Sequence, residues 1–112
     1  MKFVRTILVV MVAMCCMSFT VVIDAGHGGN DAGAIGHVLK IKEKDLNLSV
    51  AQRLADKIRQ HYPEVNVVMT RTTDVFLPLQ QRADIVNKNH ADLFICVHTN
   101  AAENRKACGA ET

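Results

Sequence analysis

The sequence lacks the features that mark several common protein classes. It has no tryptophan and one tyrosine, aromatic residues make up only 4% of the chain, and the formal net charge is +2. Lysine and arginine are spread along the chain, so composition gives no support for nucleic-acid binding. A phosphate-binding loop is also absent, because no Lys-Ser or Lys-Thr pair follows the glycines at residues 26–36.

Cysteine is too sparse for a disulfide framework. The four cysteines form no Cys-x-x-Cys pair, which argues against a zinc site made of thiolates. Cys96 lies inside a strand-like run, where we expect a small buried residue. A bridge between Cys96 and Cys108 is the alternative in an exported protein.

The N-terminal stretch has the pattern of an export signal. Lys2 and Arg5 precede an uncharged apolar run at residues 7–17, which is shorter than the roughly 20 residues of a membrane-spanning helix. We therefore predict a signal peptide over residues 1–18 and export to the periplasm or cell envelope. The alternatives are an uncleaved anchor, lipidation of a cysteine in this stretch, or a hydrophobic first strand. We expect contact with a membrane only if this stretch stays attached as an anchor.

The remainder, residues 19–112, has the length of one small domain. Hydrophobic periodicity predicts strands near residues 21–25, 65–70 and 93–97, and helices at 43–61 and 78–90. This alternation predicts an α/β fold with an open, mainly parallel sheet and helices packed on it. Three strands make a thin sheet, so we expect a fold that is incomplete at its C-terminus.

Each predicted helix carries an apolar stripe that we expect to pack on the sheet. The stripe of the first helix consists of Leu46, Val50, Leu54 and Ile58, with Ala51 and Ala55 beside it. The stripe of the second helix consists of Leu79, Ala83 and Val86.

Two of the predicted strands end in a histidine. His27 follows the first strand and His98 follows the third, so both are expected at the sheet edge where open α/β folds bind ligands. Glu43, at the start of the first helix, belongs to the same edge, with Asp45 as its alternative. Two imidazoles and one carboxylate form a zinc site that leaves a fourth position for water. The pattern therefore predicts Zn²⁺ or another divalent ion at these residues.

Other polar residues have predicted roles around this edge. We expect Asp24 to orient His27, and Asn100 to turn the chain or contact substrate. Arg71 and Arg82 are expected to form surface ion pairs with an aspartate such as Asp74 or Asp84. The remaining histidines, which we expect to be solvated, are His37, His61 and His90.

Together these motifs resemble the zinc-dependent N-acetylmuramoyl-L-alanine amidases of bacterial cell walls. The resemblance covers residues 20–112 and is carried by VVIDAGHGG at 21–29, EKDLNL at 43–48, TRTTD at 70–74, Leu79 with Arg82, and ADLFICVHTNA at 91–101. It implies a hydrolase-like or phosphorylase-like fold, with His27, Glu43 and His98 as zinc ligands. It also implies cleavage of the amide between muramic acid and the first L-alanine of peptidoglycan, an activator protein as a further partner, and Arg71 in the site.

The sequence departs from this family in two ways. Family members continue for several strands and helices and carry a second glutamate that acts as general base, so we expect the base to lie beyond Thr112. Glu111 matches a mid-domain stretch of the family and is only the second choice for this role. Cys96 stands where the family commonly has serine. The alternatives to an amidase are therefore a zinc- and peptidoglycan-binding fragment without a general base, or a chain from a truncated reading frame without function.

Overall fold

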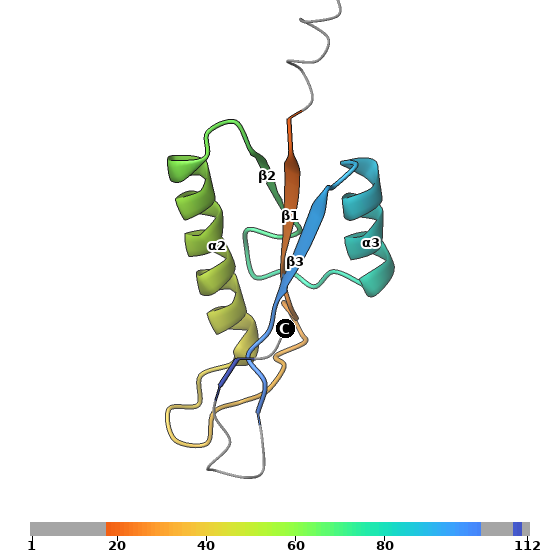
Figure 1. Cartoon of the computed structure of the whole chain (residues 1–112). Coiled ribbons are helices and arrows are strands. Elements are labelled where there is room, and N and C mark those ends of the chain that lie inside the picture. Colours follow the sequence, from red (N-terminus) through yellow and green to blue (C-terminus); the bar gives the residue numbers. More distant parts are fainter. Residues whose placement is uncertain (1–17, 102–108, 111–112) are drawn as a thin grey trace, which may run out of the picture.

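The computed structural model describes residues 18–101 and 109–110, and it contains a three-stranded sheet flanked by two helices (Figure 1). The elements are β1 (Thr20–Ala25), α2 (Glu43–His61), β2 (Asn66–Met69), α3 (Leu79–Lys88) and β3 (Leu93–Val97). This order confirms the predicted α/β fold. Within these described ranges no helix is long and apolar enough to cross a membrane. Most of the predicted signal peptide lies outside them.

The sheet is parallel, and β1 lies in its centre in the order β2-β1-β3. All six residues of β1 are buried, since this strand has a neighbour on both edges and helices on both sides. Ala25 is in register with Val97, and the Gly26 amide continues the ladder by donating to the Val97 carbonyl at 3.0 Å. The residues that follow β1 and β3 therefore leave the sheet side by side.

Helix α2 packs against β1 and β2 through small side chains. Ala51 and Ala55 are fully buried in the core with Val21 and Ile23 of β1, and Leu54 and Ile58 pack around them. The predicted stripe is wrong in its first half, because Leu46 and Val50 are 39% and 50% exposed. The buried face contains, at every fourth position, Glu43, Asn47, Ala51 and Ala55.

Helix α3 lies on the other side of the sheet (Figure 1). The prediction that an apolar stripe attaches it is wrong for Leu79, which is 85% exposed, and for Ala83, which is also exposed. The buried residue of α3 is Arg82, so a guanidinium group provides the attachment that the stripe was expected to give.

Strand β3 lies at the edge of the described sheet. Leu93 and Phe94 are each 45% exposed, and Cys96 is an exposed free thiol, so the prediction that Cys96 is buried is wrong. Strand β3 pairs only with β1 among the described strands, so the main chain along its outer edge has no strand partner within them. Cys108, the other half of the alternative bridge, lies outside the described residues.

Candidate metal centre

His27, Glu43 and His98 come together at the carboxyl edge of the sheet. His27 is in the loop after β1, Glu43 is the first residue of α2, and His98 directly follows β3. Nε2 of His27 lies 3.2 Å from Oε2 of Glu43, and Nδ1 of His98 lies 3.1 Å from Oε1 of Glu43. The two imidazole rings meet edge to face with their centroids 4.9 Å apart. One ligand atom from each residue lies within 4.8 Å of the others.

The residues present fit a zinc ion in both chemistry and spacing. Two imidazoles and a carboxylate are a common catalytic zinc set. Donors at the usual zinc–ligand length of about 2.0–2.1 Å around a tetrahedral ion lie roughly 3.3 Å apart. The 3.2 Å separation between His27 Nε2 and Glu43 Oε2 matches this, and small side-chain movements would bring in the third donor.

Two glycines leave the space that the three side chains occupy. A Cβ atom on Gly26 would lie 2.5 Å from Nε2 of His98. A Cβ atom on Gly33 would lie 2.7 Å from both Oε2 of Glu43 and Cδ2 of His27, and Gly33 also has a left-handed φ of 64°. Any larger residue at these positions would displace the imidazoles or the carboxylate.

The Glu43 carboxylate is held in place as an anion. Burial alone would raise its pKa, but hydrogen bonds from the amides of Ala34 and Thr99 and from the Asn47 side chain, together with His98, lower the pKa from 4.5 to about 2. The N-terminus of α2 adds the positive end of the helix dipole. An ionised, 6% exposed carboxylate between two imidazoles is suited to a cation.

The partner of His27 is Asp31 rather than Asp24. Nδ1 of His27 lies 2.8 Å from Oδ2 of Asp31, while the Gly33 amide donates to Oδ1 of the same carboxylate. A carboxylate only accepts hydrogen bonds, so Nδ1 faces it as a donor and Nε2 is turned toward Glu43. This pairing fixes the ring orientation that a metal site needs.

Asp24 instead belongs to a buried network beneath the loop. Its Oδ1 accepts hydrogen bonds from Thr70 at 2.5 Å and Arg82 at 2.7 Å, and its Oδ2 accepts one from the Cys96 thiol at 3.1 Å. These bonds outweigh burial and lower the pKa of Asp24. Although Cys96 as a residue is exposed, its sulfur is partly withdrawn from water beside Asp24; this desolvation and the hydrogen bond and charge of Asp24 raise the pKa of Cys96 to about 12, so the thiol remains a donor.

Both arginines that we expected at the surface are buried. Arg71 and Arg82 are 3% and 6% exposed, which makes the prediction of surface ion pairs wrong. Arg82 pairs with buried Asp24, whereas Arg71 donates to main-chain carbonyls, including those of Ala25 and Gly26. Asp74 pairs with Lys44.

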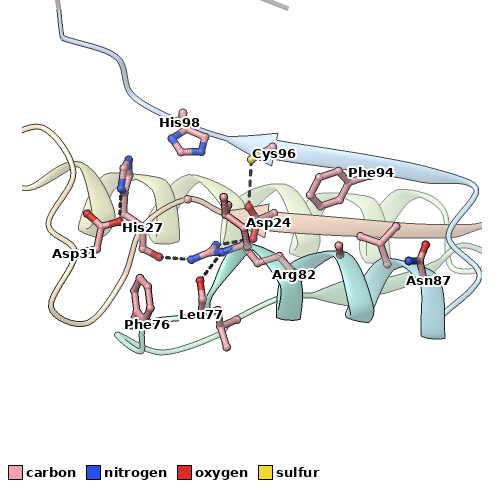
Figure 2. A pocket seen from close by; sticks show the side chains of 14 residues that line it. Asp24, His27, Asp31, Phe76, Leu77, Arg82, Asn87, Phe94, Cys96 and His98 are labelled. Carbon is pink, nitrogen blue, oxygen red and sulfur yellow. Dashed lines mark hydrogen bonds and ion pairs between the residues drawn. The ribbon is translucent and has the colours of Figure 1, made fainter.

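A cavity of about 570 Å³ lies between α3 and the sheet and extends to His27 and His98 (Figure 2). His27, Asp31 and His98 line one end, and Arg82 lies at its middle. The rest of the lining is largely apolar and includes Phe76, Leu79, Val86 and Phe94. A bound molecule could therefore reach the three candidate ligands along this wall.

The chain is similar to proteins of one known family. The model of a family described as N-acetylmuramoyl-L-alanine amidase matches residues 21–112, which is most of the chain and includes all three candidate ligands. The chain belongs to the N-acetylmuramoyl-L-alanine amidase family.

The relatives of this family member include proteins of known structure. The chain is 41% identical over 90 residues to the amidase AmiC of Escherichia coli, covering 80% of the chain and 21% of AmiC. The catalytic domain of the amidase CwlV of Bacillus (Paenibacillus) polymyxa is 38% identical, with a TM-score of 0.75, over 80% of the chain and 49% of that domain. An amidase from Clostridium difficile 630 is 40% identical, with a TM-score of 0.75, over 81% and 48%. The chain thus spans less than half the length of these relatives.

Several residues that shape this amidase-family site were not predicted from the sequence. Asn47 is fully buried, donates to the Gly26 carbonyl and to Glu43, and accepts a hydrogen bond from the Thr99 hydroxyl. Its position four residues after Glu43 was the available signal, because both then share one helix face. Asp31 had no comparable signal, since a loop gives no periodicity.

The other predicted site residues lie around the centre or outside the described residues. Asp45 is exposed, which leaves Glu43 as the helix residue at the site. Asn100 is exposed two positions after His98, while Glu111 lies outside the described residues. The histidines expected to be solvated are all exposed, as predicted: His37, His61 and His90.

Proposed function

We propose that this chain carries the zinc-binding part of an exported amidase that hydrolyses the bond between N-acetylmuramic acid and L-alanine in peptidoglycan. The observation that supports this most directly is the convergence of His27, Glu43 and His98 in a chain of the amidase family. The N-terminal pattern of charges and apolar residues agrees with a substrate outside the cytoplasm.

The residues of the chain have distinct tasks in this reaction. Zinc, when bound, would polarise the amide carbonyl and make water a stronger acid. Asp31 holds Nδ1 of His27 so that Nε2 is the ring atom left for the metal. Asn47 and the Ala34 and Thr99 amides keep the Glu43 carboxylate ionised and oriented. A carboxylate that takes a proton from water and passes it to the leaving amine completes the set, and we place it beyond Thr112, with Glu111 as the second choice.

The proposal is tested by zinc content and amidase activity of the same preparation. We expect one zinc ion per chain, and loss of that zinc in His98→Ala. His61→Ala is the matched control, because His61 is an exposed histidine at the far end of α2, and it should keep its zinc. Unchanged zinc content in His98→Ala would refute the ligand set.

Activity is measured as release of free stem peptides from purified peptidoglycan with zinc present. Release would show that the 112 residues suffice and would favour Glu111 as the base. Zinc binding without release favours the alternative of a zinc- and peptidoglycan-binding fragment. Adding the activator of a related amidase would test whether such a partner is required.

A further inference from the structure

We propose that Arg82 is a positioning residue for His27, an inference that rests on the proposed zinc site. Arg82 belongs to α3, on the opposite side of the sheet from Glu43 and α2. Figure 2 shows its guanidinium group extending from α3 to the end of β1 and to the loop that carries His27. The hydrogen bonds of Arg82 go to Asp24 and to main-chain carbonyls rather than to the side chains of the candidate ligands, so its effect on the metal would pass through the main chain of His27.

The main chain at His27 has an unfavourable conformation that needs support. His27 has a φ of 61°, and Gly28 and Gly29 follow with φ values of 131° and 57°. The two glycines adopt such values easily, whereas a residue with a Cβ atom does so at a cost. Neighbouring contacts must therefore stabilise His27 in this conformation.

Arg82 supplies one such contact to His27 and anchors itself to the surrounding chain through its other two guanidinium nitrogens. Its Nη2 donates to the His27 carbonyl at 2.8 Å, and its Nη1 donates to Asp24 Oδ1 at 2.7 Å and to the Ala25 carbonyl at 2.9 Å. Its Nε donates to the Leu77 carbonyl at 2.9 Å. Because the guanidinium is a rigid plane, these bonds fix the His27 carbonyl relative to the last residues of β1.

Arg71 provides a natural comparison, because it is equally buried and also binds carbonyl groups. Its nitrogens donate to the carbonyls of Ala25, Gly26, Lys44 and Thr73. Arg71 therefore supports the chain just before His27 and, through Lys44, the first turn of α2, while Arg82 binds the His27 carbonyl itself. A purely structural role would make the two arginines equivalent, but a positioning role would not.

The test compares three arginine variants of the full chain. Arg82→Lys keeps a positive charge beside Asp24, but one ammonium group cannot serve all four acceptors. Zinc affinity is measured by competition with a chromophoric chelator under conditions where circular dichroism shows a folded protein. We expect Arg82→Lys to bind zinc about 10- to 100-fold more weakly, as when residues that support a metal ligand are lost. Its Co²⁺ complex should also show an altered visible spectrum.

The controls separate positioning from stability. Arg71→Lys should lower the melting temperature to a similar extent while changing zinc affinity less than Arg82→Lys does. Arg59→Lys, at an exposed arginine of α2, should change neither quantity. Equal losses of zinc affinity in the Arg71 and Arg82 variants, each in proportion to lost stability, would overturn the proposal.

A second measurement covers the case in which Arg82→Lys does not fold, and it needs no metal. In NMR spectra of the unaltered, metal-free chain, we expect one set of His27 ring signals with nuclear Overhauser contacts to Glu43, and slow exchange of the Arg82 Nε proton. Averaged His27 signals beside a protected Arg82 would overturn the proposal. Failure of the unaltered chain to bind zinc would refute the proposed function instead, and this NMR test of Arg82 would still stand.

Discussion

Among single residues, Glu43 best shows how the fold prepares a group for a cation. A buried carboxylate normally gains a raised pKa, because burial disfavours the charged form. Here the amides of Ala34 and Thr99 and the side chain of Asn47 donate to it and reverse that tendency. The same bonds make the folded state depend on the ionisation of Glu43.

We therefore predict an acid-sensitive stability for the metal-free chain. The pKa of Glu43 is lowered from 4.5 to about 2 on folding, so its contribution is fully present above pH 4.5 and is lost as the pH falls toward 2. Urea unfolding in a chelator, measured from pH 6 to pH 2.5, should show the free energy of unfolding decrease across this window. Asp24, Asp31 and Asp74, whose pKa values are also lowered, add to the decrease.

Glu43→Gln isolates the contribution of the single carboxylate. We expect this variant to be less stable at pH 6 and to have a flatter pH dependence, while Glu64→Gln, at an exposed position, should follow the unaltered chain. Parallel pH curves for Glu43→Gln and the unaltered chain would contradict the assignment.

At the residue scale, the sequence predicted that the three candidate metal ligands lie close together, but it did not predict their hydrogen-bond partners. The proximity of His27, Glu43 and His98 could be predicted, because the carboxyl ends of parallel strands and the starts of the following helices lie at the same edge of the sheet. Asp24 was predicted as the partner of His27, but the partner is Asp31. This pairing depends on a loop with left-handed main-chain conformations, which hydrophobic periodicity cannot predict. The burial of Arg82 depended on how far its long side chain reaches across the sheet end.

At the scale of elements, α2 packs through its smallest side chains. Ala51 and Ala55 are fully buried and bring the helix close to β1, which also lets Glu43 and Asn47 on the same face reach the sheet edge. A bulky residue on this face would thus affect both the core and the position of the Glu43 carboxylate.

We predict that Ala51→Leu destabilises the fold by about 1–3 kcal/mol, because extra methylene groups must enter a filled core. Val50→Leu adds one methylene group at the neighbouring, half-exposed position and should change stability by less than about 0.5 kcal/mol. Urea unfolding of both variants at neutral pH checks this. Equal stability of the two variants would show that the face of Ala51 is not closely packed.

The bounds of the helices could be predicted well from the sequence, whereas the side of each helix that is buried could not. Helix α2 begins at Glu43 and ends at His61, as predicted, and α3 runs from Leu79 to Lys88 where a helix at residues 78–90 was expected. The apolar stripe through Leu46 and Val50 was misleading because hydrophobicity ranked these residues above Asn47. Packing distance and hydrogen bonding at the site decided which face was buried.

For the whole molecule, the proposed zinc site should couple metal binding to stability. A ligand that binds only the folded chain stabilises it by about 2.7 kcal/mol at a concentration 100-fold above its dissociation constant. Each kcal/mol raises the melting temperature of a domain of 60–100 residues by about 4–8 °C. We therefore predict a higher melting temperature with zinc, reversal by a chelator, and no shift in His98→Ala. An equal shift in that variant would place the bound zinc elsewhere.

The wide spacing of the three candidate ligands along the chain has a consequence for folding kinetics. Glu43 and His98 are 55 residues apart, and His98 reaches the site only after β3 has paired in parallel with β1. Such non-local pairing forms late in folding, because the entropy cost of closing a long loop must be met before the stabilising contacts can form. In a zinc finger, by contrast, nearby ligands let the metal drive folding. In this chain the ion would enter an assembled sheet, so zinc should slow unfolding and leave the folding rate almost unchanged.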